Sequence, residues 1–249
     1  MHSDRAEVVT FEEAREPLLE QVWPLKQRVW PAFMLEDAVA ARYWQAMEER
    51  FPDCQWLLVE EGVVLAAGHA VPFHYDGTLS ERGWDWVLAR AVLDHDAGRW
   101  PNAVSAIEIS VDLAYRGRGL SHRMVRELRA IARRRRAAHL VAPVRPAGKA
   151  AYPLAPMERY AAWTREDGLP FDPWLRVHAR QGARRVGVAP ASMEITGSLD
   201  DWQAWTGMAF PDSGPYIVPG ALCPVDIDVE ADRGVYREPN VWMRHDVNT

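Results

Sequence analysis

Ala106-Ile-Glu-Ile-Ser-Val-Asp-Leu-Ala-Tyr-Arg-Gly-Arg-Gly-Leu-Ser-His-Arg-Met-Val125 is the stretch of this sequence that says most about the fold. An apolar, β-branched run leads into a turn rich in Arg and Gly, and the turn opens directly onto an amphipathic helix. This arrangement aims free backbone N–H groups and the positive end of a helix dipole at one point. The stretch therefore predicts a strand–turn–helix unit that holds a phosphate or pyrophosphate group at the turn.

The turn Arg116-Gly-Arg-Gly-Leu-Ser121 differs from two common phosphate-binding motifs. No Gly-Lys-Ser/Thr follows it, which excludes a P-loop NTPase, and His122 stands where the dinucleotide fingerprint requires its third glycine. The turn instead matches the pattern R-x-x-G-x-(G/A) at every position except the last. Its two glycines have no Cβ, so the backbone can approach a ligand closely and adopt a positive φ.

The composition narrows the class of protein. The chain has 249 residues, of which 48% are hydrophobic and 26% charged, as expected for one large globular domain or one domain with an extension. A net charge of -6 offers no basic field that would favour nucleic acid or an anionic membrane. The two cysteines and the scattered His, Asp and Glu residues lack metal-ligand spacing, so no metal is expected. No apolar run approaches the length of a membrane span, and we expect a cytoplasmic protein.

Hydrophobic periodicity and turn residues outline the remaining elements. Helices are expected over residues 16–31, 36–50, 85–94, 121–136, 157–165, 173–181 and 199–206. Strands are expected over residues 6–13, 54–60, 63–71, 104–111, 139–144, 185–188, 192–196, 216–229 and 234–244, the last two as a hairpin around residues 231–234. The dipeptide Glu61-Gly62 predicts a hairpin, and the strand–helix–strand order around residues 121–136 predicts two parallel strands.

The strand, the Arg116-Gly-Arg-Gly turn and the helix after it resemble motif A of the GNAT superfamily of acyl-CoA-dependent N-acetyltransferases. The order of the expected elements agrees with that family over about residues 6–190. The resemblance implies an α/β fold with a mixed, mostly antiparallel, twisted sheet flanked by helices. It implies an acyltransferase domain over residues 1–190 and a C-terminal, β-rich extension over 191–249 that packs on the same domain. The extension either covers the acceptor pocket, extends the sheet or forms a contact in a homodimer.

The resemblance also implies a co-substrate and a reaction. Acetyl-CoA or another acyl-CoA would place its pantetheine arm along three residues of the strand and its pyrophosphate on the turn. The residues so assigned are Ile109, Ser110 and Val111 for pantetheine, and Arg116, Gly117, Arg118, Gly119, Leu120 and Ser121 for pyrophosphate. Ser121 departs from the usual Gly or Ala, but its side chain is small. The implied reaction is direct transfer of an acetyl or other short acyl group to an amine of a small molecule or peptide.

Four residues are candidates for proton transfer. The superfamily commonly protonates the leaving thiolate with a tyrosine four residues before a glycine. His178 takes that position in Val177-His-Ala-Arg-Gln-Gly-Ala183, and a histidine can act as acid or base near neutral pH. Tyr160 and Tyr152 are rival acids. Glu108 is the candidate general base, because partial burial on the central strand would raise its pKa.

Two alternatives remain open at this point. The acyl group could go to oxygen or to a carrier thiol instead of an amine. The chain could also be a CoA-binding sensor or interaction protein that has lost the chemistry, since the usual tyrosine is replaced by His178.

Overall fold

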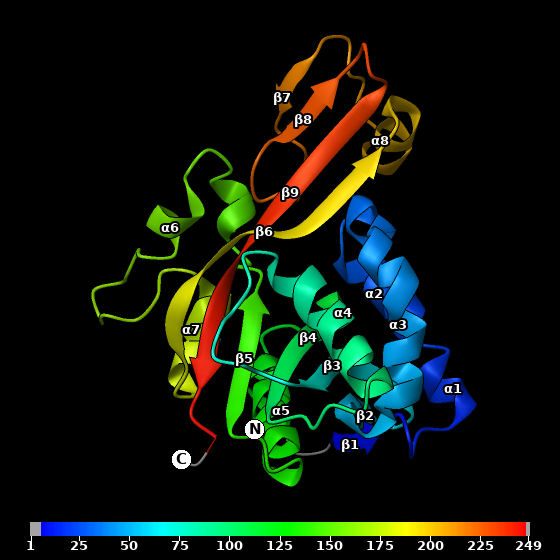
Figure 1. Ribbon diagram of the computed structural model, residues 1–249, viewed down its shortest axis with the longest axis vertical. Coiled ribbons are helices and arrows are strands. Elements are labelled where there is room, and N and C mark those ends of the chain that lie inside the picture. The colour runs from blue at the N-terminus through cyan, green and yellow to red at the C-terminus, as the bar shows by residue number, and fades with distance from the viewer. Residues whose placement is uncertain (1–5, 248–249) are drawn as a thin grey trace.

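The computed structural model describes residues 6–247, and its strands form one mixed sheet (Figure 1). The strand order is β1-β2-β3-β4-β5-β9-β8-β7, with β6 paired to β9. The strands are β1 (Glu7–Thr10), β2 (Gln55–Glu60), β3 (Val63–Phe73), β4 (Ala103–Val111), β5 (His139–Val144), β6 (Arg184–Gly197), β7 (Gly214–Tyr216), β8 (Val225–Asp228) and β9 (Arg233–His245). Within the described residues only β4 and β5 pair in parallel, so the mixed, mostly antiparallel sheet is confirmed.

The helices agree with the periodicity in most places. They are α1 (Glu16–Leu19), α2 (Val22–Val29), α3 (Ala38–Arg50), α4 (Gly83–Asp96), α5 (Leu120–Arg134), α6 (Met157–Tyr160), α7 (Pro173–Arg180) and α8 (Leu199–Thr206). The single helix expected over 16–31 is wrong, because Pro24 has no N–H to bond the carbonyl of Glu20 and its ring crowds that carbonyl. The helix expected over 157–165 is also shorter than predicted. None of the helices in residues 6–247 has the length and apolar character needed to cross a membrane.

The hairpin between β2 and β3 has the turn that its sequence predicted. Glu61 and Gly62 both have positive φ, 52° and 79°. Two consecutive residues of this kind produce the tight turn whose twist matches that of paired strands. The crossover from β4 through α5 to β5 likewise produces the expected parallel pair.

The parallel pair is short, and this shortness creates the site. β4 and β5 pair only from Ala103 to Ser105 on one strand and from His139 to Val141 on the other. Beyond this point β4 continues along β3, while β5 continues along β9. The two strands therefore diverge and leave a wedge between their facing edges. A bulge in β4 at Ile107 adds to the bend.

The C-terminal part of the chain belongs to the same sheet. The two short strands expected over 185–188 and 192–196 are one strand, β6, in which bulges absorb the irregular positions around Gly187 and Pro190. The hairpin expected around residues 231–234 forms between β8 and β9, but its first strand is shorter than the expected 216–229, since β7 ends at Tyr216 and β8 covers only Val225–Asp228. β9 runs from the β7–β8 end of the molecule to a position beside β5 (Figure 1). The boundary expected at residue 190 thus falls inside β6.

Both faces of the sheet are covered by apolar packing. Along β2, Trp56 and Leu58 belong to the main core, whereas Leu57 and Val59 pack in a separate cluster with α2. Alternate residues of a strand point to opposite faces, so α2 covers the face of β2 opposite to Trp56 and Leu58. α2 is thereby held against the sheet beside β4, where its polar residues reach the wedge.

Candidate active site

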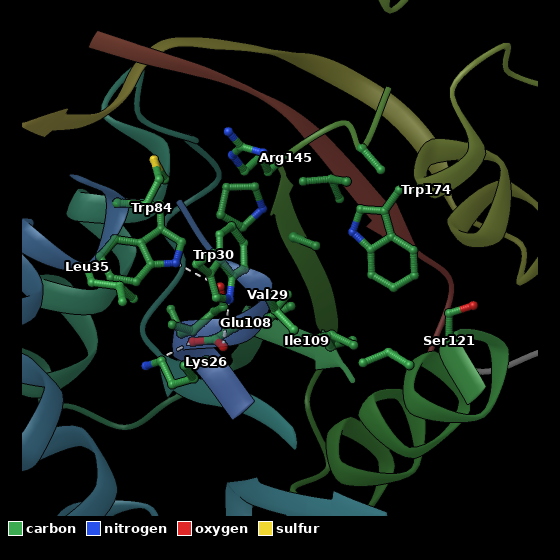
Figure 2. A pocket seen from close by; sticks show the side chains of 18 of the residues that line it. Lys26, Val29, Trp30, Leu35, Trp84, Glu108, Ile109, Ser121, Arg145 and Trp174 are labelled. Carbon is green, nitrogen blue, oxygen red and sulfur yellow. Dashed lines mark hydrogen bonds and ion pairs between the residues drawn. The ribbon is translucent and has the colours of Figure 1, made fainter. Parts of the chain in front are cut away.

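A cavity of about 1490 Å³ opens where β4 and β5 diverge (Figure 2). Residues 106–109 and Val111 of β4 line one wall, and residues 142–144 of β5 line another. Among the residues that the structure describes, none pairs with the edge of β4 that faces β5 from Ala106 onward. Such an edge suits an extended chain that adds to it as a further strand would.

The cradle at one end of the cavity is the N-terminus of α5. Gly117 and Gly119 have φ of 81° and 76°, in the left-handed region that favours glycine. Helix geometry leaves the first backbone N–H groups of α5, at Gly119, Leu120 and Ser121, without intrahelical acceptors. These donors and the helix dipole fit a pyrophosphate. Five of the six residues predicted for this role line the cavity: Arg116, Gly117, Gly119, Leu120 and Ser121.

The side chains of two of the residues predicted to bind the co-substrate form contacts within the protein. The side chain of Arg118 donates to both carboxylate oxygens of Glu60, at 3.0 and 3.1 Å, and does not line the cavity. Ser110 is fully buried and donates a hydrogen bond to Glu108, while its neighbours Ile109 and Val111 do line the cavity. Both placements follow from tertiary contacts rather than from the motif.

Glu108 lies in the cavity wall as the centre of a polar cluster (Figure 2). Its carboxylate forms an ion pair with the Lys26 ammonium at 3.1 Å and accepts hydrogen bonds from the Trp30 indole at 3.0 Å and from Ser110. Burial alone raises the pKa of Glu108, but Lys26, His69 and Ser110 lower it, and the net pKa lies below the ordinary value. The expected raised pKa is therefore wrong, and Glu108 is a carboxylate at neutral pH.

His178 lines the cavity from α7 and is 2% exposed. Its Nδ1 lies 2.9 Å from Nε2 of His245, the last residue of β9, so one ring donates to the other. Burial and the neighbouring His245 hold the pKa of His178 well below its usual value, and burial with Arg129 lowers the pKa of His245 to about 4. Both imidazoles are neutral at pH 7. Because Nδ1 is occupied, Nε2 is the nitrogen of His178 that is available to the cavity.

The two tyrosines considered as rival acids lie outside this site. The Tyr160 hydroxyl is buried and donates to Asp172 at 2.8 Å, and burial together with Asp172 raises its pKa. Asp172 also caps α7 by accepting from Trp174 and Leu175, so Tyr160 helps to fix the start of that helix. Tyr152 packs edge-on against neighbouring aromatic rings. Neither tyrosine lines the cavity.

The opposite end of the cavity has an aromatic and charged lining that motif reasoning did not assign. Its aromatic walls and charged side chains come from elements far apart in the sequence: Lys26, Trp30, Trp44, Glu48, Glu49, Trp84, Arg145 and Glu238. The Lys26 ammonium lies 3.3 Å from the centroid of the Trp44 ring. One signal was present in the sequence, since Lys26 interrupts the apolar stripe of α2 between Leu25 and Val29.

No group of three His, Cys, Asp or Glu side chains that could hold a metal ion occurs within residues 6–247.

Comparison with known proteins agrees with this geometry. Residues 16–159 match the model of the acetyltransferase (GNAT) family. The arginine N-acetyltransferase avaD of Aspergillus versicolor is 32% identical to this chain over 88% of the chain and 86% of the relative. The loading GNATL domain of CurA from Lyngbya majuscula superposes with a TM-score of 0.62 at 16% identity, over 97% of this chain and 98% of that domain. The GphF GNAT-like decarboxylase in complex with isobutyryl-CoA has a TM-score of 0.62 at 18% identity, over 97% of this chain and 100% of the other. At these identities the two structures share the fold.

Proposed function

The chain belongs to the acetyltransferase (GNAT) family and is an acyl-CoA-dependent N-acetyltransferase, and we propose that its acceptor is arginine or a close cationic relative of arginine. The similarity to an arginine N-acetyltransferase over most of both chains supports this acceptor. The observation that carries the proposal is the surplus of carboxylate at the end of the cavity away from the cradle.

That surplus follows from the ion pairs of the cavity. Lys26 pairs with Glu108, and Arg145 pairs with Glu238. Glu48 and Glu49 also line the cavity. Nε2 of the buried His69 lies 3.6 Å from Glu48, and neither glutamate forms an ion pair with a lysine or arginine of residues 6–247. The site thus has an excess of negative charge, which attracts a cationic acceptor.

Glu48 is the better candidate to bind a guanidinium. Its side chain is 32% exposed and accepts a hydrogen bond from the Trp44 indole at 2.7 Å, which orients the carboxylate. Burial raises the pKa of Glu48, but His69, Trp44 and Lys26 lower it below its ordinary value, so the group is charged at neutral pH. A planar guanidinium makes charge-assisted hydrogen bonds to such a carboxylate and stacks on indole rings like those that line this part of the cavity.

Acyl transfer needs a neutral amine as nucleophile. We propose that Glu108 accepts the proton that the acceptor amine loses. Acetyl-CoA, bound along β4 and on the cradle of α5, supplies the activated acetyl group. Glu108 is a carboxylate in the cavity wall, held by Lys26 and Trp30, and takes the proton from the acceptor amine directly or through one water.

We propose that His178 acts on the sulfur of the thioester. The 2.9 Å contact between Nδ1 of His178 and Nε2 of His245 allows either ring to donate, and the proposal selects the tautomer in which Nδ1 of His178 accepts and its Nε2 carries the proton. That N–H stabilises negative charge that develops on the leaving sulfur. In this proposal His178 acts by a hydrogen bond, because its lowered pKa leaves no cationic form at neutral pH.

The acceptor proposal is tested by thiol release from acetyl-CoA in the presence of arginine, with the product identified by mass. Glu48→Gln should lower kcat/KM for arginine about tenfold or more through loss of a charge-assisted hydrogen bond. Glu12→Gln, on an exposed turn, is the matched control and should leave it unchanged. Turnover of an uncharged amine with none of arginine would contradict the proposed acceptor.

The cytoplasmic location and the homodimer stay predictions. Cell fractionation tests the location, and light scattering on the purified protein tests the oligomeric state.

A further inference from the structure

Arg145 is a charged residue of the cavity that the transfer reaction described above does not use. It is the first residue after β5 and lines the wedge where β4 and β5 have diverged. Figure 2 shows it on the side of the cavity that carries Trp30 and Trp84, away from Ser121 and the cradle. Its guanidinium lies 5.7 Å from the centroid of the Trp30 ring. The acceptor, rather than the phosphates of the donor, is therefore the ligand within its reach.

The guanidinium is fixed from one side by a buried carboxylate. Its Nε donates to Glu238 at 2.8 Å, and its Nη2 donates to the Gly220 carbonyl. Glu238 is fully buried and also accepts from the Tyr236 hydroxyl and the Asn240 amide, each at 3.0 Å. Glu238 and the Gly220 carbonyl thus hold one edge of the guanidinium, Tyr236 and Asn240 fix Glu238, and the Arg145 side chain is only 18% exposed.

The remaining donors of Arg145 point to a ligand. A guanidinium has five N–H donors in a planar fork, and these contacts use two of them. In the part of the chain that the structure describes, Nη1 has no hydrogen-bond partner. A planar fork with free donors at the rim of an acceptor pocket matches a carboxylate, which accepts two parallel hydrogen bonds from it.

We propose that Arg145 binds the carboxylate of the acceptor, so that the enzyme acetylates free α-amino acids in preference to amines without a carboxylate. This inference deepens the proposed function and rests on its claim that the acceptor is a small amine in this cavity. Arg145 and the carboxylate of Glu48 would then hold the two ends of an arginine molecule, its carboxylate and its guanidinium. The amine would lie between them, near Glu108.

The test compares arginine with argininamide, which keeps the amine and the guanidinium but replaces the carboxylate by a neutral amide. For each protein, kcat/KM for arginine is divided by kcat/KM for argininamide. Because the two amines differ in basicity, this ratio is then normalised to its value in the wild type. Arg145→Met should lower this normalised ratio about 100-fold, through loss of paired charge-assisted hydrogen bonds. Arg145→Lys should lower it less, since the charge remains but the planar fork is lost.

Two further variants separate binding from folding. Arg145→Met leaves Glu238 buried without its cation, so the double variant Arg145→Met/Glu238→Gln removes that burden and should show the same loss of arginine preference. Glu238→Gln alone keeps Arg145 and is the matched control, which should retain at least part of the preference. The shift of Tm on adding CoA checks that the cradle is intact in every variant.

An equal loss with arginine and argininamide in the Arg145 variants would overturn the inference, because it would show a purely structural role. If the wild type acetylates neither compound, the proposed acceptor is wrong, and the same comparison is made over free amino acids and their amides. A carboxylate preference for any of them that Arg145→Met abolishes supports the inference. No such preference across the panel, in turnover or in calorimetric binding to the CoA-loaded protein, overturns it.

Discussion

Replacement of Lys26 by methionine should destabilise the protein strongly, because it leaves Glu108 in the interior without its cation. The Lys26 ammonium lies 3.1 Å from the carboxylate, and the two side chains are only 9% and 6% exposed. With an effective dielectric constant of about 20, two charges at this separation attract by about 5 kcal/mol. Removal of one partner of a buried pair typically costs 3–5 kcal/mol, and we expect a loss of about this size at pH 8.

The loss should depend on pH with a definite sign. In the wild type, the pKa of Glu108 lies below its ordinary value, so the stabilisation from the ion pair is present above about pH 4.5 and is lost as the pH falls through the folded pKa. In Lys26→Met, burial is no longer opposed by the ammonium, and the pKa of Glu108 should rise above its ordinary value. The variant then loses up to about 1.4 kcal/mol per pH unit between pH 4.5 and the new pKa. The gap between the two proteins should therefore widen from pH 5 to pH 8.

The assay is urea unfolding at pH 5 and pH 8 for the wild type, Lys26→Met, Glu108→Gln and the double variant. The double variant should recover at least half of the loss caused by Lys26→Met, because a neutral amide leaves no charge to bury. Three results would refute this reasoning. They are a loss of stability in Lys26→Met below about 1 kcal/mol at pH 8, a stability difference from the wild type that does not widen with pH, and a double variant no more stable than Lys26→Met.

Three further predictions address the buried acid pair, the imidazole and the cradle. Burial and the adjacent Asp37 raise the pKa of Asp85 to about 8, so wild-type stability should fall as the pH rises toward 8. Asp85→Asn should be increasingly more stable than the wild type over that range in urea unfolding, and a gap independent of pH would argue against a buried protonated acid. His178→Gln should lower kcat about tenfold or more with little change in KM for the acceptor, measured by thiol release, and an unchanged kcat would assign the residue a structural role. The Cβ of Gly119→Ala would meet no atom within 4 Å, but the residue would have to keep a left-handed φ. The variant should therefore lose about 1 kcal/mol of stability, seen as a lower Tm, and have a higher KM for acetyl-CoA. Gly187→Ala is the control, because it is also unobstructed and has no positive φ, and it should change neither quantity.

Much of the geometry of the proposed donor half of the site was predictable, because its parts are adjacent in the chain. A phosphate is bound by backbone N–H groups of consecutive residues, so Arg116, Gly117 and Gly119 with the helix after them define the cradle by local geometry. Arg118 was the exception in the turn, because its partner Glu60 lies on another strand. The Glu61-Gly62 hairpin was predictable for the same local reason.

The acceptor half was not predictable, because its contacts join distant residues. Arg145 and Glu238 are 93 residues apart, and His178 and His245 are 67 apart. The pKa of Glu108 shows the consequence most clearly. Burial on a central strand predicts a raised pKa, and only the folded position of α2 brings Lys26 close enough to reverse the direction.

By itself, the sequence determined the strand–turn–helix unit and the parallel crossover, since these follow from the conformations of consecutive residues, and it carried the resemblance to the GNAT family. Only the tertiary structure decided which charges line the proposed acceptor end of the cavity. The energy of a buried charge depends on partners within a few ångströms, and here different segments of the chain supply those partners.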